Sequence, residues 1–374
     1  MKKESRHHFT HGLTIALLPA LAVIMIACSP QASQTPSSKG TESTAVKLVF
    51  ITQPSGAEAG SVLAILPVVA AEDANGNIVT RSNRVVILTI TGSPPGSGDL
   101  FGGTTVVSAN GTFQFKDIAV DKAGTYTLTA TSRGLDPAIS APFDITPIGG
   151  AKLIFNGQIT GASAGSPLAA QPVVTVVDMY GNKAANSTAQ VSLSLVPITP
   201  ESYEAALSGP VSVKAINGTV EFKGLSVDIA GSYVLIATSG SLIPAQSNVF
   251  DIKPGAAVKL FFNTQPLTTT PGSPLTVQPP AIAVLVQDVF GNTVTDSSAE
   301  ITVIITPNTG TSGAILSGVS KLKASNGVGA FEGLTIDKVG NGYTLTATSS
   351  GLTAAVSDTF DITPAANSSN STTP

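Results

Sequence analysis

The residue types that most often do chemistry in proteins are confined to the start of this chain. Cys28 is the single cysteine, and the three histidines are His7, His8 and His11. Beyond Cys28 the chain, which has 374 residues, contains no His, Cys or Trp. Ser–His–Asp and Cys–His catalysis, zinc or iron sites with His or Cys ligands, and disulfide bonds all need these residues. The sequence therefore predicts a protein that is not an enzyme, has no cofactor and is held together by its cores alone.

Cys28 follows a segment with the layout of a secretory signal peptide. A basic start precedes an apolar run that ends at Ala27 and is short for a membrane span. The residues Met25-Ile26-Ala27-Cys28 resemble the lipobox of bacterial lipoproteins, with Met25 where that pattern usually has Leu. The resemblance implies cleavage before Cys28 and lipid attachment to it, and Ser29 after it is permissive for the outer membrane. The alternative is an ordinary signal peptide in which Cys28 has no role.

Carboxylates are the remaining side chains that could bind a ligand or take part in catalysis. Three of them open a turn of the pattern Asp-x-x-Gly-Asn. The three turns are Asp73 to Asn77, Asp178 to Asn182 and Asp288 to Asn292. Their oxygens are ligands of the kind that calcium takes, but Asp and Asn also favour tight turns because they hydrogen-bond their own backbone. Tyr180 and Phe290 stand where the first turn has Asn75, so the ligand set is not repeated. We therefore predict turns without a metal, with calcium binding as the alternative.

The other recurring acids are also expected to have structural roles. These are Asp121, Asp228 and Asp337, predicted to cap turns, and Asp144, Asp251 and Asp361, which lie close to linkers. No spacing marks a pair of acids for glycoside hydrolysis. Sugar-binding surfaces usually present exposed aromatic rings, and only Tyr180 and Tyr203 lie outside the recurring tyrosine positions. We expect ordinary exposure for both, with a local glycan-binding patch as the alternative.

Charge patterning excludes one class of partner. The formal net charge is −4, only 11% of the residues are charged, and no basic stripe runs along the chain. A nucleic-acid partner would need such a stripe to neutralise phosphates, so none is expected.

The rest of the chain repeats itself with a period of about 107 residues. Each copy opens with Lys and an apolar triplet, continues to the Asp-x-x-Gly-Asn turn and an Asn-Gly pair, and ends with Phe-Asp-Ile-x-Pro. The Asn-Gly pairs begin at Asn110, Asn217 and Asn326, and the closing motifs begin at Phe143, Phe250 and Phe360. Asn-Gly tolerates the positive φ angles of a type I′ hairpin turn. Apolar residues alternate around it, which predicts strands with one buried face, although Gly329 leaves the third copy short of one core side chain.

A tyrosine preceded by Asp and Gly is the most informative landmark. Tyr126, Tyr233 and Tyr343 each lie two residues before a leucine that is expected to be buried. This arrangement matches the tyrosine corner of immunoglobulin folds, whose hydroxyl bonds back to the backbone. Short strands, frequent turn signals and no helical period of useful length complete the pattern. The sequence therefore predicts an all-β chain of three tandem immunoglobulin-like antiparallel β-sandwich domains.

The copies resemble the bacterial immunoglobulin-like (Big) repeats of the invasin and intimin type. The residues that carry the likeness are Asp73-Ala-Asn-Gly-Asn77, Asn110-Gly111, Ala123-Gly124, Thr129-Ala130 and their counterparts. Such repeats build stalks and adhesive rods on bacterial surfaces. The resemblance implies a non-catalytic, extracytoplasmic protein anchored in a membrane through Cys28, at the cell surface or outer membrane, that acts as an adhesion or interaction rod. A protein or glycan partner is expected but unknown. The alternatives are a passive envelope spacer and a calcium- or glycan-binding lipoprotein.

These interpretations divide the chain into six segments. The signal peptide is 1–27, a disordered tether is 28–45, the domains are 46–147, 151–254 and 257–364, and a disordered tail is 365–374.

Overall fold

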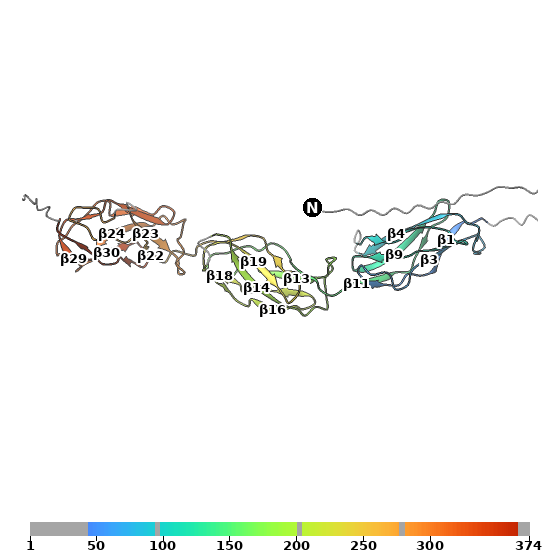
Figure 1. The fold of residues 1–374 in the computed structure, drawn as a ribbon. Helices are drawn as coiled ribbons and strands as arrows, with labels where there is room; N and C mark the ends of the chain where they lie inside the picture. Colours follow the sequence, from blue (N-terminus) through green and yellow to red (C-terminus); the bar gives the residue numbers. More distant parts are fainter. Residues whose placement is uncertain (1–43, 94–97, 200–203, 277–280, 366–374) are drawn as a thin grey trace, which may run out of the picture. The chain divides into compact units, whose positions relative to one another are not determined.

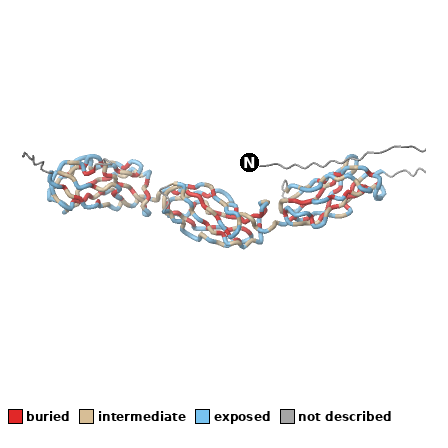
Figure 2. Tube along the Cα trace, viewed as in Figure 1, coloured by how far each residue is buried: buried red, intermediate tan, exposed pale blue. Residues whose placement is uncertain are grey.

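The computed structural model describes residues 44–93, 98–199, 204–276 and 281–365. The chain divides into two units, Met1–Thr44 and Ala45–Pro374, and of the first unit only Thr44 lies within the described residues. Every regular element of the described residues is a β-strand (Figure 1). Buried residues gather inside each of three repeats, and exposed residues cover them (Figure 2). The prediction of an all-β chain is therefore confirmed.

The first repeat forms two principal sheets. Its strands are β1 Lys47–Thr52, β2 Ala57–Glu58, β3 Val68–Glu72, β4 Val85–Ser93, β5 Leu100–Phe101, β6 Thr105–Val107, β7 Thr112–Gln114, β8 Ala119–Val120, β9 Gly124–Thr131, β10 Ala138–Ile139 and β11 Phe143–Thr146. One sheet has the order β1-β3-β7 and the other β2-β11-β9-β4-β6, with β10 also paired to β9. The pairs are antiparallel except β2 with β11, which is parallel.

The second repeat has the same arrangement. Its strands are β12 Lys152–Phe155, β13 Val173–Val177, β14 Gln190–Pro197, β15 Leu207–Ser208, β16 Ser212–Lys214, β17 Thr219–Glu221, β18 Ser226–Val227, β19 Gly231–Thr238, β20 Ala245–Gln246 and β21 Phe250–Ile252. The sheets have the orders β12-β13-β17 and β16-β14-β19-β20, with β21 paired to β19.

The third repeat again contains a three-stranded sheet beside a larger one. Its strands are β22 Lys259–Phe262, β23 Ala281–Gln287, β24 Glu300–Ile305, β25 Leu316–Ser317, β26 Lys321–Lys323, β27 Val328–Glu332, β28 Thr335–Ile336, β29 Gly340–Tyr343, β30 Leu345–Thr348, β31 Ala355–Val356 and β32 Phe360–Ile362. The sheet orders are β22-β23-β27 and β26-β24-β30-β31, and β29 pairs with β32.

Each repeat has its own hydrophobic core between the two sheets. In the first repeat Val69 and Phe113 from one sheet and Val86 and Leu128 from the other are all fully buried in one cluster. The alternation of the sequence produces this arrangement, because successive side chains of a strand point to opposite faces. Leu128 and its counterparts Leu235 and Leu345 are fully buried in the cores of their repeats.

The Asn-Gly pairs form tight turns, as their residue types predict. Asn110 and Gly111 have φ angles of 53° and 78°, both in the left-handed region. Ala109 and Thr112 on either side form an antiparallel bridge, so the pair closes a short hairpin. A Cβ atom on Gly111 would lie 2.5 Å from the carbonyl oxygen of Val79, so the position requires glycine for packing as well as for backbone angle.

Gly329 shows how one core compensates for a missing side chain. It takes the place of Phe113 in the first repeat, and a Cβ atom there would lie 2.9 Å from Ile301 Cδ1 and 3.4 Å from Leu322 Cδ1. Ile301 and Leu322 occupy the positions that are valines in the first repeat. The larger neighbours therefore fill the space that the glycine leaves, which is the local repacking that the sequence predicts.

Candidate functional site: the polar turns at the ends of the repeats

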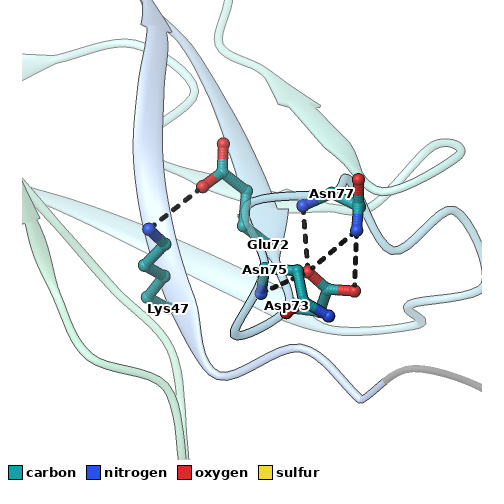
Figure 3. A network of polar contacts seen from close by, with 5 residues as sticks. All are labelled: Lys47, Glu72, Asp73, Asn75 and Asn77. Atoms are coloured by element: carbon teal, nitrogen blue, oxygen red, sulfur yellow. Dashed lines mark hydrogen bonds and ion pairs between the residues drawn. The ribbon is translucent and has the colours of Figure 1, made fainter.

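The Asp-x-x-Gly-Asn turns share one local geometry. Oδ1 of Asp73 accepts hydrogen bonds from the backbone N–H groups of Asn75 and Asn77, both at 2.9 Å (Figure 3). The Asn77 amide also lies 3.3 Å from Oδ2 of Asp73, and a separate ion pair joins Lys47 to Glu72 at 3.3 Å beside the turn. Asp178 and Asp288 accept the same pair of backbone bonds at 2.8–2.9 Å. The aspartate thus organises its own turn by accepting backbone donors.

The asparagine that ends the second turn also bonds to the first repeat. Oδ1 of Asn182 accepts the backbone N–H of Ala123 at 2.9 Å, and its Nδ2 donates to the carbonyl oxygen of Asp121 at 2.9 Å and to Oδ2 of Asp178 at 2.9 Å. The Lys122 ammonium donates in turn to the carbonyl oxygen of Tyr180. Asn182 is only 8% exposed, so these bonds are sheltered from water.

The third turn repeats this contact with the second repeat. Oδ1 of Asn292 accepts the N–H of Ala230 at 2.8 Å, and Nδ2 donates to the carbonyl oxygen of Asp228 at 2.9 Å. Asn77, which ends the turn of the first described repeat, is exposed. We call each set of bonds from an Asp-x-x-Gly-Asn turn to the preceding repeat a joint: the first joint is built on Asn182 and the second on Asn292.

An aromatic ring accompanies each joint. Tyr180 packs against the core of the first repeat, and its ring lies where a Cβ atom of Gly60 would be. The Phe290 ring lies in the same way over Gly165 of the second repeat. Tyr180 is half-buried, so the expectation of ordinary surface exposure is wrong: the ring covers a glycine of its neighbour instead of offering a free platform for sugar.

The linker supplies a further donor to the turn aspartates. The backbone N–H of Gly255 donates to Oδ2 of Asp288 at 2.8 Å, and that of Ile148 lies 3.4 Å from Oδ2 of Asp178. Burial raises the pKa of Asp288, but the hydrogen bonds from Asn292, Gly255 and Phe290 outweigh it and hold the pKa below its ordinary value of 3.8. The carboxylate is therefore an acceptor for several N–H donors at once.

This geometry bears on the calcium alternative. A calcium ion takes six to eight oxygen ligands, and it would have to displace the N–H donors that already occupy both oxygens of Asp288. Within the described residues no group of three or more His, Cys, Asp or Glu side chains is placed to hold a metal ion. Hydrogen bonds from N–H groups therefore account for both carboxylate oxygens of Asp288.

The three recurring tyrosines are buried in the cores of their repeats. Their hydroxyl groups donate to backbone carbonyl oxygens a few residues upstream: Tyr126 to Lys122 at 2.9 Å, Tyr233 to Ile229 at 2.7 Å and Tyr343 to Lys338 at 2.9 Å. Each ring is at most 1% exposed and contacts the phenylalanine of the closing motif, with ring centroids 5.9–6.3 Å apart. Each tyrosine therefore links a backbone segment at one end of its repeat to the core, and in the first two repeats this segment also contains the joint residues.

The other recurring aspartates accept hydrogen bonds in the same positions of every repeat. Asp121, Asp228 and Asp337 accept backbone N–H groups from Asp99, Ala206 and Ile315 at 2.7–2.8 Å. Asp144 and Asp251 accept the hydroxyls of Thr125 and Ser232 at 2.6 Å, and Asp361 accepts the N–H of Gly342 at 2.8 Å. These acids brace loops and strand ends.

Several sequence predictions concern other parts of the chain. Cys28, the leader, nearly all of the tether and tail, and Tyr203 lie outside the described residues. Among the residues that are described, none form a helix long and apolar enough to span a membrane.

The joints were missed in the sequence, although a signal was present. The change from Asn75 to Tyr180 and Phe290 predicts an interrupted ligand set, and does not by itself indicate a contact between repeats. An aromatic residue in the second and third turns, but not in the first, distinguishes the two repeats that have a repeat before them.

No model of a protein family matches the chain, and no curated protein does. InvD of Yersinia pseudotuberculosis is 17% identical over 86% of this chain and 98% of its own, with a TM-score of 0.32. The D00–D0 domain of intimin is 14% identical over 55% of this chain and 98% of its own, with a TM-score of 0.30.

A β-glycosidase from Bacteroides vulgatus also matches, at 11% identity and a TM-score of 0.25, over 55% of this chain. The match spans only 25% of that enzyme's length. The fold of the described residues rests on their own strand order, which is all-β with two principal sheets around a core in each repeat.

Proposed function

We propose that this chain is a lipid-anchored, non-catalytic protein of a bacterial cell surface, and that its repeats form a rod for adhesion or interaction. The observation that carries the proposal is the recurrence of the joint. Asn182 and Asn292 make the same bonds to the repeat before them, and an aromatic ring accompanies each. Recurring hydrogen bonds between successive repeats suit a protein that presents its far repeats to a partner, because they oppose motion of one repeat against the next.

The anchor in this proposal is Cys28. Its position at the end of an apolar run, and the absence of any other cysteine in the sequence, support acylation of this residue. Several acyl chains on one residue hold a protein stably on a membrane, whereas a single chain does not. The mature chain would then begin at the membrane, and the tether would separate the lipid from the first repeat.

The experiment compares wild type with Cys28→Ser in the native cell. Membrane fractionation and protease treatment of intact cells are measured together. We expect the wild type to be membrane-bound and degraded from outside, and Cys28→Ser to be released. A membrane-bound but protected wild type would contradict the surface role and favour an envelope spacer. An unchanged distribution of Cys28→Ser would contradict the lipid anchor.

A further inference from the structure

In the larger sheet of the first repeat, the outward side chains of β4, β6 and β9 are uncharged, and the acid Asp144 lies beyond them on β11. The outward side chains of β4 from Val85 to Thr91 are Val, Ile and Thr, and Val107 of β6 lies directly beside Val85. Val85 and Ile87 are each 46% exposed, Val107 is 62% exposed and Ile139 on β10 is 68% exposed. Threonines of β9 separate Ile87 from Ile139. Val and Ile at this exposure form an apolar patch on an otherwise hydroxyl-bearing surface.

The same positions in the other repeats carry polar and charged groups. Gln190 and Lys214 of the second repeat occupy the places of Val85 and Val107. Glu300 and Lys323 occupy them in the third repeat, where Glu300 also pairs with Lys321 at 2.8 Å. Lysine on an edge strand opposes the addition of another strand, because pairing would bring its charge against the incoming chain. The first repeat has Val107 at this position and therefore lacks the charge that opposes strand addition.

The edge of the sheet is available for pairing. β6 lies at the end of the strand order, and among the described residues no strand pairs with its outer side. Leu88 N donates to Thr104 O at 2.8 Å and Ser108 N to Arg84 O at 3.0 Å. Successive residues of an antiparallel strand direct their backbone N–H and C=O groups to alternate sides. Thr105 and Val107 therefore direct these groups away from β4, whereas Val106 directs its groups toward β4. The edge thus presents hydrogen-bonding groups beside an apolar surface.

We propose that β6 is a self-association edge, which pairs antiparallel with β6 of a second copy of this chain. A two-fold axis at Val106 places Thr105 beside the second copy's Val107 and joins the two apolar patches into one. The same pairing at the third repeat would set Lys323 beside the second copy's Lys321, and like charges opposite each other destabilise a strand pair. Thr-Val-Val carries no charge that would oppose pairing with itself, and this difference from the third repeat is the reason to assign a second copy as the partner. This inference concerns the repeats themselves and does not depend on the lipid anchor.

The test is oxidative cross-linking of the processed full chain after purification and concentration. Thr105→Cys with Val107→Cys places two thiols where the second copy brings their counterparts within the range of a disulfide. The matched control is Thr105→Cys alone, whose thiol lies beside Val107 of the second copy and beyond disulfide range of the second copy's own Cys at position 105. Both variants keep Cys28, so any cross-link through that residue appears equally in the two.

We expect the double variant to shift to twice its mass on a non-reducing gel, and the control to stay at single mass. Equal products from both variants, or no product from the double variant, would overturn the assignment. A product of another mass after oxidation of intact cells would show that a different protein occupies the edge, and would overturn it as well.

Val107→Lys provides a second measurement without cysteines. The side chain is exposed, so the repeat is expected to fold, and its melting temperature checks this. Sedimentation of the concentrated chain should show a dimer for wild type and a monomer for Val107→Lys. A wild type that stays monomeric, or a dimer that survives the lysine, would contradict pairing at β6.

Discussion

Replacing Asn182 with Ala tests whether the first joint contributes to stability. The substitution removes the acceptor of the Ala123 N–H and the donor to Asp121 O, both at 2.9 Å. Because the site is nearly closed to water, the Ala123 N–H and Asp121 O would lose partners that solvent replaces poorly. Each such bond contributes about 1 kcal/mol net, so the joint should lose about 2 kcal/mol.

Hydrogen exchange at the Ala123 amide measures this loss directly. Exchange of this N–H requires the joint to open, so a loss of about 2 kcal/mol should accelerate it roughly thirtyfold. Asn77→Ala is the matched control, because Asn77 ends the same turn in the first repeat and is exposed. Asn77→Ala should leave the exchange of Ala123 unchanged.

Two results would refute the reasoning. If the Ala123 amide exchanges equally fast in wild type and Asn182→Ala, the hydrogen bond at the joint does not protect it. If Asn77→Ala accelerates exchange as much as Asn182→Ala, the effect comes from loss of the turn asparagine in general and not from the bonds between repeats.

Three further predictions concern the individual repeats. Tyr233→Phe should lower the free energy of unfolding of the second repeat by about 1–2 kcal/mol in urea denaturation, because its hydroxyl bond is lost, and no change would contradict a structural role for that bond. Gly218→Ala should lower the melting temperature more than Gly224→Ala: both glycines have positive φ angles, but only at Gly218 would the Cβ meet backbone, at 2.3 Å. Asp288→Asn should destabilise the third repeat at neutral pH, and the difference from wild type should shrink as pH falls below 3.8, because the lowered pKa of Asp288 contributes stability only while the carboxylate is ionised. Thermal melts across pH test this, with Asp296→Asn at an exposed site as the control, and a difference that stays constant in acid would contradict it.

Local patterns were sufficient to predict most of the fold. Alternation around Asn110-Gly111 depends only on side-chain direction along a strand and on the φ angles that Asn and Gly tolerate, and both are properties of neighbouring residues. The bond that Tyr126 makes also spans only four residues. Such features are present in the sequence itself, and three copies of each strengthened the interpretation.

The joints could not be predicted in the same way. Asn182 contacts Asp121 and Ala123 across 61 and 59 residues, and no local rule specifies which surface of one repeat meets the next. The apolar edge at β6 had a visible signal, since Val107 stands where Lys214 and Lys323 recur. Recognising it required the strand order, because the significance of an uncharged strand depends on whether it lies at an edge.

The side chain at the third position of the turn contributes to the joint but not to the turn itself. All three aspartates accept the backbone donors of their own turn, so the Asp and Asn at its ends serve the turn whether or not a repeat precedes it. The backbone N–H groups of Asn75, Tyr180 and Phe290 each donate to the aspartate of their own turn. The aromatic side chains are therefore not needed to form the turn. Their rings differ only in covering a glycine of the preceding repeat. The aromatic side chain at this position is therefore the part of the turn that serves only the contact with the preceding repeat.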